Sequence, residues 1–323
     1  MENRLNGTKI AVIIPAYNVE KHILEVISTL PSYISFIIVI DDASTDRTYE
    51  IVANLARKDE RIRLIKHHLN QGVGGAMVSG FKKALELDAD ICVKMDGDGQ
   101  MDPSYLPNLV NPLINGEADY TKGNRFRDFS ALKSMPTLRR FGNLVLSFLV
   151  KAATGYWNIF DPTNGFIAIR KEVLLELPME NIEKTYFFET SMLANLYLIN
   201  AKITDIPIPA RYGNEQSNLK ISRVVIEFPP KLIGILIRRI LLKYFLFDFS
   251  IASVYLAIGL PLFVFGFIFG IINWIRFSSL GVPAPTGTVM LATLSVIIGI
   301  QFLLSFIQFD IGSIPQKPRT KKI

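Results

Sequence analysis

The sequence predicts an α/β protein in which a mostly parallel sheet is followed by a membrane-spanning tail. Short β-branched runs, such as residues 10–14 and 36–40, alternate with segments of helical periodicity, a pattern typical of right-handed βαβ units. Acidic or glycine-rich segments follow these runs, as expected where buried parallel strands end at the ligand-binding edge of a sheet. Two long apolar stretches follow Ser250, and each is long enough to cross a bilayer.

Strands and helices are expected to alternate along the first two-thirds of the chain. Strands are expected at residues 10–14, 36–40, 62–65, 91–93, 118–122 and 166–169. Helices are expected at residues 19–30, 76–87 and 138–153, in a segment ending near 56, and from about residues 103 and 187. Ser44, Thr45 or Asp46 can cap the helix that ends near 56, and Pro103 suits a first helical turn.

Composition limits the classes of protein to which this chain can belong. Its 323 residues allow one large domain and an appendage, and the mean hydropathy of +0.30 reflects the apolar residues after Ser250. The single cysteine, Cys92, excludes an internal disulfide framework, and its place in an apolar strand predicts a buried thiol. The net charge of +6 fits an anionic partner, and the apolar stretches favour membrane lipid over nucleic acid.

The segment around Asp96 and Asp98 is the strongest candidate for chemistry. An apolar strand stops at these two carboxylates, which are separated only by Gly97, so both can turn toward one hard cation. Gln100 adds a neutral oxygen. Such a donor set suits Mg²⁺ or Mn²⁺, which keep open positions for phosphate oxygens. A solvated acidic turn is the alternative interpretation.

Several motifs occur in an order that resembles a known family. Residues 15–20 (Pro-Ala-Tyr-Asn-Val-Glu), 41–46 (Asp-Asp-Ala-Ser-Thr-Asp) and 96–98 (Asp-Gly-Asp) each follow an apolar run, and together they resemble the family 2 glycosyltransferases. Within that family, the chain resembles the polyprenyl-phosphate sugar transferases, including dolichyl-phosphate mannose synthases. This closer resemblance lies at residues 96–100, 123–126, 161–166 and 211–219. The resemblance covers about two-thirds of the chain and implies a Rossmann-like, nucleotide-sugar-binding GT-A fold.

The resemblance implies a role for each motif on the donor side. Pro15, Tyr17 and Glu20 would frame the nucleotide base and ribose. Asp41 or Asp42 would accept a hydrogen bond from the base, with helix entry as the alternative role. The glycine cluster containing Gly72 and Gly75 would bring backbone N–H groups to the donor at a helix N-terminus. Asp96 would contact the donor or the metal, and Asp98 and Gln100 would complete the metal site.

The acceptor side is implied to be basic. Guanidinium groups match phosphate oxygens, so Arg125, with Arg139 or Arg140, is expected to contact a lipid phosphate. Arg211 would meet the acceptor or the diphosphate, and Ser217 would add a hydroxyl contact, although Asn218 stands where relatives often carry Lys. Asp161 is expected either to be catalytic or to form a turn. Glu189 is expected either to complement a helix dipole or to face the acceptor. No catalytic role is expected for His22, His67 and His68, which are interpreted as surface or packing residues.

The C-terminal third is expected to hold the protein in a membrane. We expect a glycosyltransferase domain at residues 1–222, a basic amphipathic juxtamembrane segment at 223–250 and a two-helix hairpin at 251–323. The spans are expected at about 251–275 and 288–309. Basic residues flank the hairpin and residues 1–9 lack the apolar core of a signal peptide, so the catalytic domain and both termini are expected in the cytoplasm, at the inner or plasma membrane.

These inferences lead to one expected function and two alternatives. The protein is expected to be an inverting enzyme that moves a sugar from a GDP- or UDP-linked donor to a polyprenyl phosphate, forming a lipid-linked monosaccharide for glycan assembly. One alternative is transfer to another lipid or to a polysaccharide, although a Gln-x-x-Arg-Trp signature is absent from the sequence. The other is a non-catalytic nucleotide-binding membrane scaffold. The sequence leaves open whether the protein forms a homo-oligomer.

Overall fold

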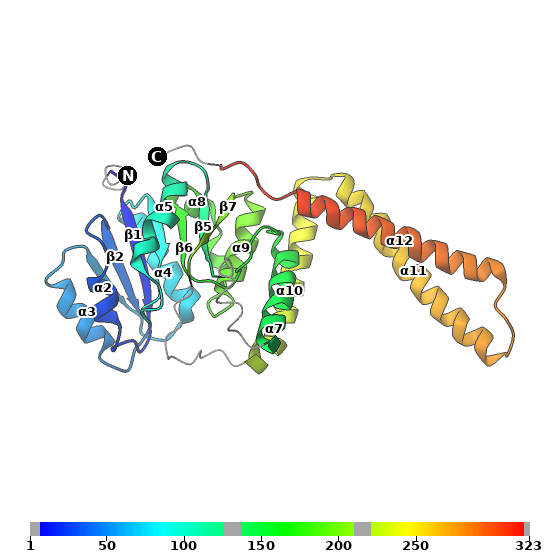
Figure 1. Cartoon of the computed structure of the whole chain (residues 1–323), viewed down its shortest axis with the longest axis horizontal. Helices are drawn as coiled ribbons and strands as arrows, with labels where there is room; N and C mark the ends of the chain where they lie inside the picture. Colours follow the sequence, from blue (N-terminus) through cyan, green and yellow to red (C-terminus); the bar gives the residue numbers. More distant parts are fainter. Residues whose placement is uncertain (1–6, 126–136, 210–220, 320–323) are drawn as a thin grey trace. The chain divides into compact units, whose positions relative to one another are not determined.

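A computed structural model describes residues 7–125, 137–209 and 221–319 of the chain (Figure 1). The chain divides into two compact units. One comprises Met1–Leu236 together with Pro315–Ile323, and the other comprises Ile237–Ile314. The first unit contains the sheet and therefore the motifs described above, and the second contains the two long apolar helices.

A seven-stranded sheet organises the first unit, in the order β3-β2-β1-β4-β6-β5-β7. Its strands are β1 (Ile10–Ala16), β2 (Phe36–Asp41), β3 (Ile62–Lys66), β4 (Ile91–Lys94), β5 (Tyr120–Asn124), β6 (Ile167–Arg170) and β7 (Ile203–Pro207). The predicted α/β fold with a mostly parallel sheet is confirmed, because β1 to β4 are all parallel. β6 runs antiparallel between β4 and β5, and β7 was not expected from the sequence.

The helices of the first unit largely follow the predicted alternation. They are α2 (Ile23–Ser28), α3 (Thr48–Ala56), α4 (Gly72–Glu86), α5 (Leu106–Ile114), α7 (Thr137–Thr154), α8 (Lys171–Glu176), α9 (Phe188–Leu198) and α10 (Ile221–Leu241), with short 3₁₀ turns at Pro103–Tyr105 and Met179–Asn181. α4 begins at Gly72 rather than at Ala76, so the glycine cluster lies inside its first turn. α10 begins in the first unit and ends in the second.

Alternate residues of the central strands pack against helices on opposite faces of the sheet, as the twofold period of a strand requires. Ile10 and Val12 of β1 belong to one core cluster with buried residues of α2 and α5. Ile13 instead faces α4, where a Cβ on Gly80 would lie 2.3 Å from its Cγ2 atom. Helices therefore pack on both faces of the sheet, and in such sheets ligands bind at the carboxyl ends of the strands.

The second unit is built around α11 (Ile251–Ser279) and α12 (Thr286–Gly312), which form a hairpin (Figure 1). Both are long and apolar enough to cross a membrane, with mean hydropathies of 2.4 and 2.2. Glycines bring the two backbones together: a Cβ on Gly299 would lie 2.5 Å from the backbone nitrogen of Phe263, and one on Gly266 would lie 2.8 Å from the Cβ of Ser295. Small residues at such crossings are typical of helices that pack within a bilayer.

A buried ion pair lies at the base of this hairpin. Asp310 in the last turns of α12 accepts bonds of 2.5 and 3.0 Å from the two terminal nitrogens of Arg239, and a third bond of 2.6 Å from the Tyr244 hydroxyl. All three side chains are almost completely buried. The predicted span ended at residue 309, whereas α12 continues to Gly312 and includes this carboxylate.

Candidate active site

A cavity of about 610 Å³ opens at the carboxyl ends of β1, β2 and β4. Six of the residues predicted for the donor and metal sites line it: Pro15, Tyr17, Asp42, Gly72, Asp96 and Asp98. The parallel strands bring these residues together although they are up to 83 positions apart in the chain (15 to 98). Glu20, Asp41, Gly75 and Gln100 are near in sequence to the lining residues but do not themselves line the cavity.

Asp42 fixes the loop on one side of the cavity. Its carboxylate accepts hydrogen bonds from the backbone N–H groups of Gln71 (2.9 Å) and Gly72 (2.8 Å). It also lies 2.7 Å from Nδ1 of His67, whose Nε2 is 2.9 Å from the Ser79 hydroxyl. His67 is therefore a buried polar partner that sets the position of Asp42, a role more specific than the surface or packing role expected from the sequence.

Asp41 and Glu20 have different environments from the residues that line the cavity. Asp41 ends β2 and is fully buried, and neither carboxylate oxygen has a hydrogen-bond partner in the part of the chain that the structure describes. An unpaired buried carboxylate is costly, so Asp41 calls for a partner that the described residues do not supply, and its contact with the base stays a prediction. Glu20 accepts a hydrogen bond of 3.0 Å from the Arg47 backbone nitrogen and thereby holds the loop that precedes α3.

The glycine cluster serves close packing within the protein, and the expectation that its N–H groups reach the donor stays a prediction. The N–H groups of Gly74 and Gly75 donate to the carbonyl oxygen of Lys184, at 2.7 and 3.2 Å, and that of Gly72 donates to Asp42. A Cβ on Gly74 would lie 2.0 Å from the Glu183 carbonyl oxygen, so only glycine lets the loop that contains Glu183 and Lys184 approach α4.

The acidic motif contains a partner that the sequence reasoning missed. Lys94 is buried, and its Nζ lies 2.6 Å from Oδ1 of Asp96 and 3.6 Å from Oε1 of Glu189. Burial lowers the pKa of Lys94, but the carboxylates of Asp96 and Glu189 outweigh it and raise that pKa, so the ammonium stays charged. Gly165 leaves room for this ammonium, because a Cβ there would lie 2.3 Å from Nζ.

Two carboxylates at the cavity fit a divalent cation of the kind that retains non-protein ligands. Asp96 has one oxygen bound by Lys94, and Asp98 accepts a hydrogen bond of 3.0 Å from the Gln100 backbone nitrogen. Among the described residues, no group of three or more His, Cys, Asp and Glu side chains could hold a metal ion. The donor set is therefore incomplete without a ligand and suits Mg²⁺ or Mn²⁺ shared with phosphate oxygens and water.

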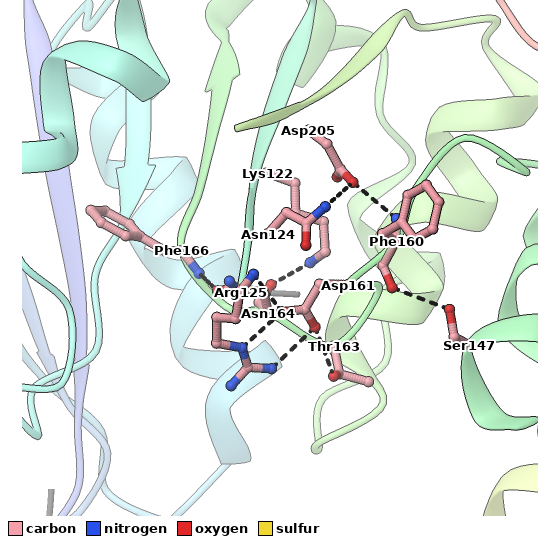
Figure 2. Close-up of polar contacts among 10 residues, drawn as sticks. All are labelled: Lys122, Asn124, Arg125, Ser147, Phe160, Asp161, Thr163, Asn164, Phe166 and Asp205. Carbon is pink, nitrogen blue, oxygen red and sulfur yellow. Dashed lines mark hydrogen bonds and ion pairs between the residues drawn. The ribbon is translucent and has the colours of Figure 1, made fainter. Parts of the chain in front are cut away.

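A second polar cluster joins Arg125 to the segment that follows α7 (Figure 2). Arg125 donates from Nε to Oδ2 of Asp161 at 2.7 Å and from Nη2 to Oδ1 at 3.1 Å. Asp161 is fully buried, whereas the Arg125 side chain is 38% exposed. The carboxylate therefore holds the guanidinium in a fixed direction at the end of β5.

Lys122 and Asp205 belong to the same polar cluster (Figure 2). Lys122 is fully buried and donates from Nζ to the Asn164 carbonyl oxygen, and burial lowers its pKa to about 8. Asp205 accepts bonds of 2.9 Å from Asn124 Nδ2 and from the Phe160 backbone nitrogen. Burial raises the pKa of Asp205 to about 6, so both groups titrate near neutral pH.

Aromatic residues form another part of the cavity wall. Phe187, at the start of α9, packs edge-on against Phe228 of α10 with ring centroids 5.0 Å apart. Lys231 pairs with Glu183 at 3.0 Å and lies 5.5 Å from the centre of the Phe187 ring. Phe187, Phe228 and Lys231 line the cavity together with Tyr186. The first half of α10 thus belongs to the site, and no local sequence signal separates it from the rest of the amphipathic segment.

Four residues predicted for the acceptor side cannot be placed. Arg211 and Ser217 lie outside the described residues. Arg139 and Arg140 lie in the first turns of α7, but their side chains are outside the described part of the chain.

A comparison with known proteins identifies the family. Residues 11–177 match the family model described as "Glycosyl transferase family 2". The chain belongs to this family. The match begins in β1 and includes Asp96, Asp98, Arg125 and Asp161.

Curated relatives within glycosyl transferase family 2 act on lipid phosphates by name. The UDP-N-acetylglucosamine–dolichyl-phosphate N-acetylglucosaminyltransferase of Methanococcus voltae is 36% identical over 68% of this chain and 92% of its own length. The undecaprenyl-phosphate mannosyltransferase of Micrococcus luteus is 29% identical over 62% of this chain and 82% of its own length.

A solved structure agrees with the fold. Glucosyl-3-phosphoglycerate synthase from Mycobacterium tuberculosis, in complex with UDP, superposes with a TM-score of 0.54 at 21% identity, covering 74% of this chain and 82% of that one. The same enzyme has been crystallised with Mn²⁺, UDP and glucosyl-3-phosphoglycerate. At this identity the likeness shows the fold alone, and it confirms the GT-A architecture.

Proposed function

We propose that this membrane-bound family 2 glycosyltransferase moves a sugar from a nucleotide-sugar to a polyprenyl phosphate and forms a lipid-linked monosaccharide. The observation that carries the proposal is the cavity at the carboxyl edge of the sheet, which Asp96 and Asp98 line together with Asp42 and the Gly72 that Asp42 holds. The named activities of the lipid-phosphate relatives, together with two helices able to span a bilayer, support a polyprenyl-phosphate acceptor.

On the donor side, Asp41 would accept a hydrogen bond from the base and Tyr17 would cover the base or ribose. Tyr17 is half exposed and lines the cavity, which leaves its ring available for stacking. Asp96 and Asp98 would hold Mg²⁺ or Mn²⁺, which when bound neutralises the charge of the departing nucleotide diphosphate. Lys94 would keep Asp96 in place, because the ammonium already occupies one of its oxygens.

On the acceptor side, an oxygen of the lipid phosphate would attack the anomeric carbon as the bond to the nucleotide diphosphate breaks, with inversion. The phosphate is anionic before it reacts, so positioning matters more than a strong base. Arg125 would orient this phosphate, and the buried carboxylate of Asp161 would hold the Arg125 guanidinium in place. Asp161 is thus proposed as a positioning residue.

We also propose that both termini lie on the cytoplasmic side of the membrane. The C-terminal tail returns to the first unit after the hairpin. There the Arg319 backbone nitrogen donates to both oxygens of buried Asp119, at 3.1 and 2.9 Å, and its guanidinium pairs with Glu176 at 2.5 Å. These contacts require the tail and the catalytic unit to be on one side, and the basic residues that flank the hairpin favour the cytoplasm.

The test is a donor screen in membranes that contain the full chain and one polyprenyl phosphate. Radiolabelled UDP-N-acetylglucosamine, UDP-glucose and GDP-mannose are supplied separately, and extraction into organic solvent measures labelled lipid. One donor is expected to label the lipid in a Mn²⁺- or Mg²⁺-dependent way. Retained nucleotide binding without transfer from any donor would favour a scaffold instead, and label in a polysaccharide fraction would favour the other alternative.

A further inference from the structure

One oxygen of Asp205 joins the two chain segments that carry Arg125 and Asp161 (Figure 2). This atom, Oδ2, accepts a hydrogen bond of 2.9 Å from Nδ2 of Asn124 and another of 2.9 Å from the backbone nitrogen of Phe160. Asn124 directly precedes Arg125, and Phe160 directly precedes Asp161. Asp205 therefore holds the residue before each partner of the ion pair, and the proposed reaction assigns it no role.

The register of the sheet brings Asp205 to this place. β5 and β7 run parallel, with Lys122 opposite Asp205. Side chains two residues apart on a strand point to the same face, so Lys122, Asn124 and Asp205 share one face of the sheet. The segment 160–164 is bonded to this face at both ends: its first residue donates from its backbone nitrogen to Asp205, and its last accepts from Lys122 through its carbonyl oxygen. Asp161 lies between these two attachments.

Further contacts hold the same segment without Asp205. The Ser147 hydroxyl donates to the Phe160 carbonyl oxygen at 3.2 Å, and the Thr163 hydroxyl donates to Oδ1 of Asp161 at 3.4 Å. Loss of the Asp205 bonds is therefore expected to move the ion pair rather than to unfold the segment.

The two oxygens of Asp205 have different environments. Oδ1 is buried and has no hydrogen-bond partner in the described part of the chain, so the bonds to both segments depend on Oδ2. An asparagine side chain also carries one acceptor oxygen, so Asp205→Asn can keep both bonds, whereas Asp205→Ala loses both. This pair of variants separates the acceptor oxygen from the charge.

We propose that Asp205 is a positioning residue that aligns the end of β5 with the segment 160–164, so that Arg125 and Asp161 form their two bonds. The inference rests on the proposed function, in which the Arg125 guanidinium orients the acceptor phosphate. Transfer depends on such alignment, because a displacement of about 1 Å caused far from the reacting atoms can cost about 100-fold in rate. Since Asp205 acts through Arg125, its removal should cost nothing further once the guanidinium is replaced.

The first test is a double-mutant cycle in membranes that contain the full chain, with initial rates measured against polyprenyl-phosphate concentration. Asp205→Ala is expected to lower kcat/KM for the acceptor by about 10-fold, the value of about one hydrogen bond. In an Arg125→Lys background, Asp205→Ala should change kcat/KM by less than about twofold. Equal fold losses from Asp205→Ala in both backgrounds would overturn the inference, because independent effects on the free energy add.

Three further variants complete this test. Asp205→Asn should restore kcat/KM to within about threefold of wild type, because the acceptor oxygen is kept. Asp205→Leu fills the space without an acceptor and should behave as Asp205→Ala. Asp59→Ala is the matched control, since Asp59 is a partly buried acid that also accepts from a backbone nitrogen but does not line the cavity, and it should leave the rates unchanged. Thermal unfolding confirms that each variant is folded.

A second measurement needs neither donor nor acceptor. Phenylglyoxal modifies arginine side chains, and mass spectrometry of peptides gives the rate at each position, with the exposed Arg57 as internal reference. Arg125 should react slowly in the wild type, because Asp161 holds its guanidinium, and faster in Asp205→Ala but not in Asp205→Asn. Unchanged Arg125 reactivity in Asp205→Ala would overturn the inference. Raised reactivity without transfer from any donor would support the alignment and count against the proposed function.

Discussion

The guanidinium of Arg125 is held by both oxygens of Asp161 through two hydrogen bonds of 2.7 and 3.1 Å. The two residues are 36 positions apart, and Asp161 is fully buried while Arg125 reaches the surface. If Arg125 contacts the acceptor phosphate as proposed, Asp161 orients that phosphate through the guanidinium without touching it.

The first prediction concerns the planar geometry of Arg125. Arg125→Lys keeps the charge but removes the fork that Asp161 holds, so kcat/KM for the polyprenyl phosphate should fall by roughly 10- to 100-fold, the value of one or two charge-assisted hydrogen bonds. Initial rates against acceptor concentration measure this, with membrane partitioning recorded alongside. Arg57→Lys, on an exposed helix end, is the control. Equal rates for both lysine variants would reject the specific role.

A second prediction concerns Asp98. Asp98→Ala should reduce transfer by roughly 10²- to 10³-fold, because it removes a carboxylate that would hold the cation at the leaving diphosphate. Calorimetry of nucleotide diphosphate binding separates this effect from misfolding: Mn²⁺ should tighten binding to the wild type and not to the variant. Asp88→Asn, an exposed acid on a turn outside the cavity, should behave as wild type. Wild-type turnover of Asp98→Ala would remove Asp98 from the metal site.

The third prediction is a pH dependence of stability from Asp205. Burial raises the pKa of its carboxyl from 3.8 to about 6, so the folded state holds this proton more tightly than the unfolded chain. The free energy of unfolding should therefore fall as pH rises from about 4 to 6. The side chain in Asp205→Asn cannot ionise, so the free energy of unfolding of this variant should not fall in this way. Above pH 6 the difference in unfolding free energy should have shifted in favour of the variant by roughly 3 kcal/mol at most, relative to the difference at pH 4.

Thermal unfolding of both proteins between these pH values measures the difference. Asp88→Asn is again the control, because the pKa of Asp88 is lowered to about 2, below the range used. A difference between wild type and Asp205→Asn that does not change with pH would mean that the Asp205 carboxyl titrates alike in both states.

The fourth prediction concerns topology. In a Cys92→Ser background, Ser279→Cys at the end of α11 should react with an impermeant thiol reagent in intact cells, and Lys321→Cys in the basic tail should react only after lysis. The reverse labelling pattern would place the catalytic unit outside.

A related prediction concerns the C-terminal tail. Asp119→Ala removes the acceptor of the Arg319 backbone nitrogen and should loosen the tail, which would be seen as faster proteolysis after Lys317.

By itself, the sequence determined the strand-and-helix alternation, the acidic motif at the end of β4 and the apolar hairpin. Each depends on local periodicity or on the residue types at a strand end, and neighbours in sequence encode both. It also indicated that the acidic segments following these strands lie at the ligand-binding edge of the sheet, because buried parallel strands end there.

Only the tertiary structure decided how distant polar groups pair. The antiparallel insertion of β6 brings the Asp161–Phe166 segment to β4 and β5, and with it Asp161 to Arg125 and Gly165 to Lys94. The pairing of His67 with Asp42 and of Lys184 with the glycines of α4 likewise joins separate loops. Hydrogen bonds between such segments depend on relative strand position and backbone approach in three dimensions, and no short-range pattern specifies either.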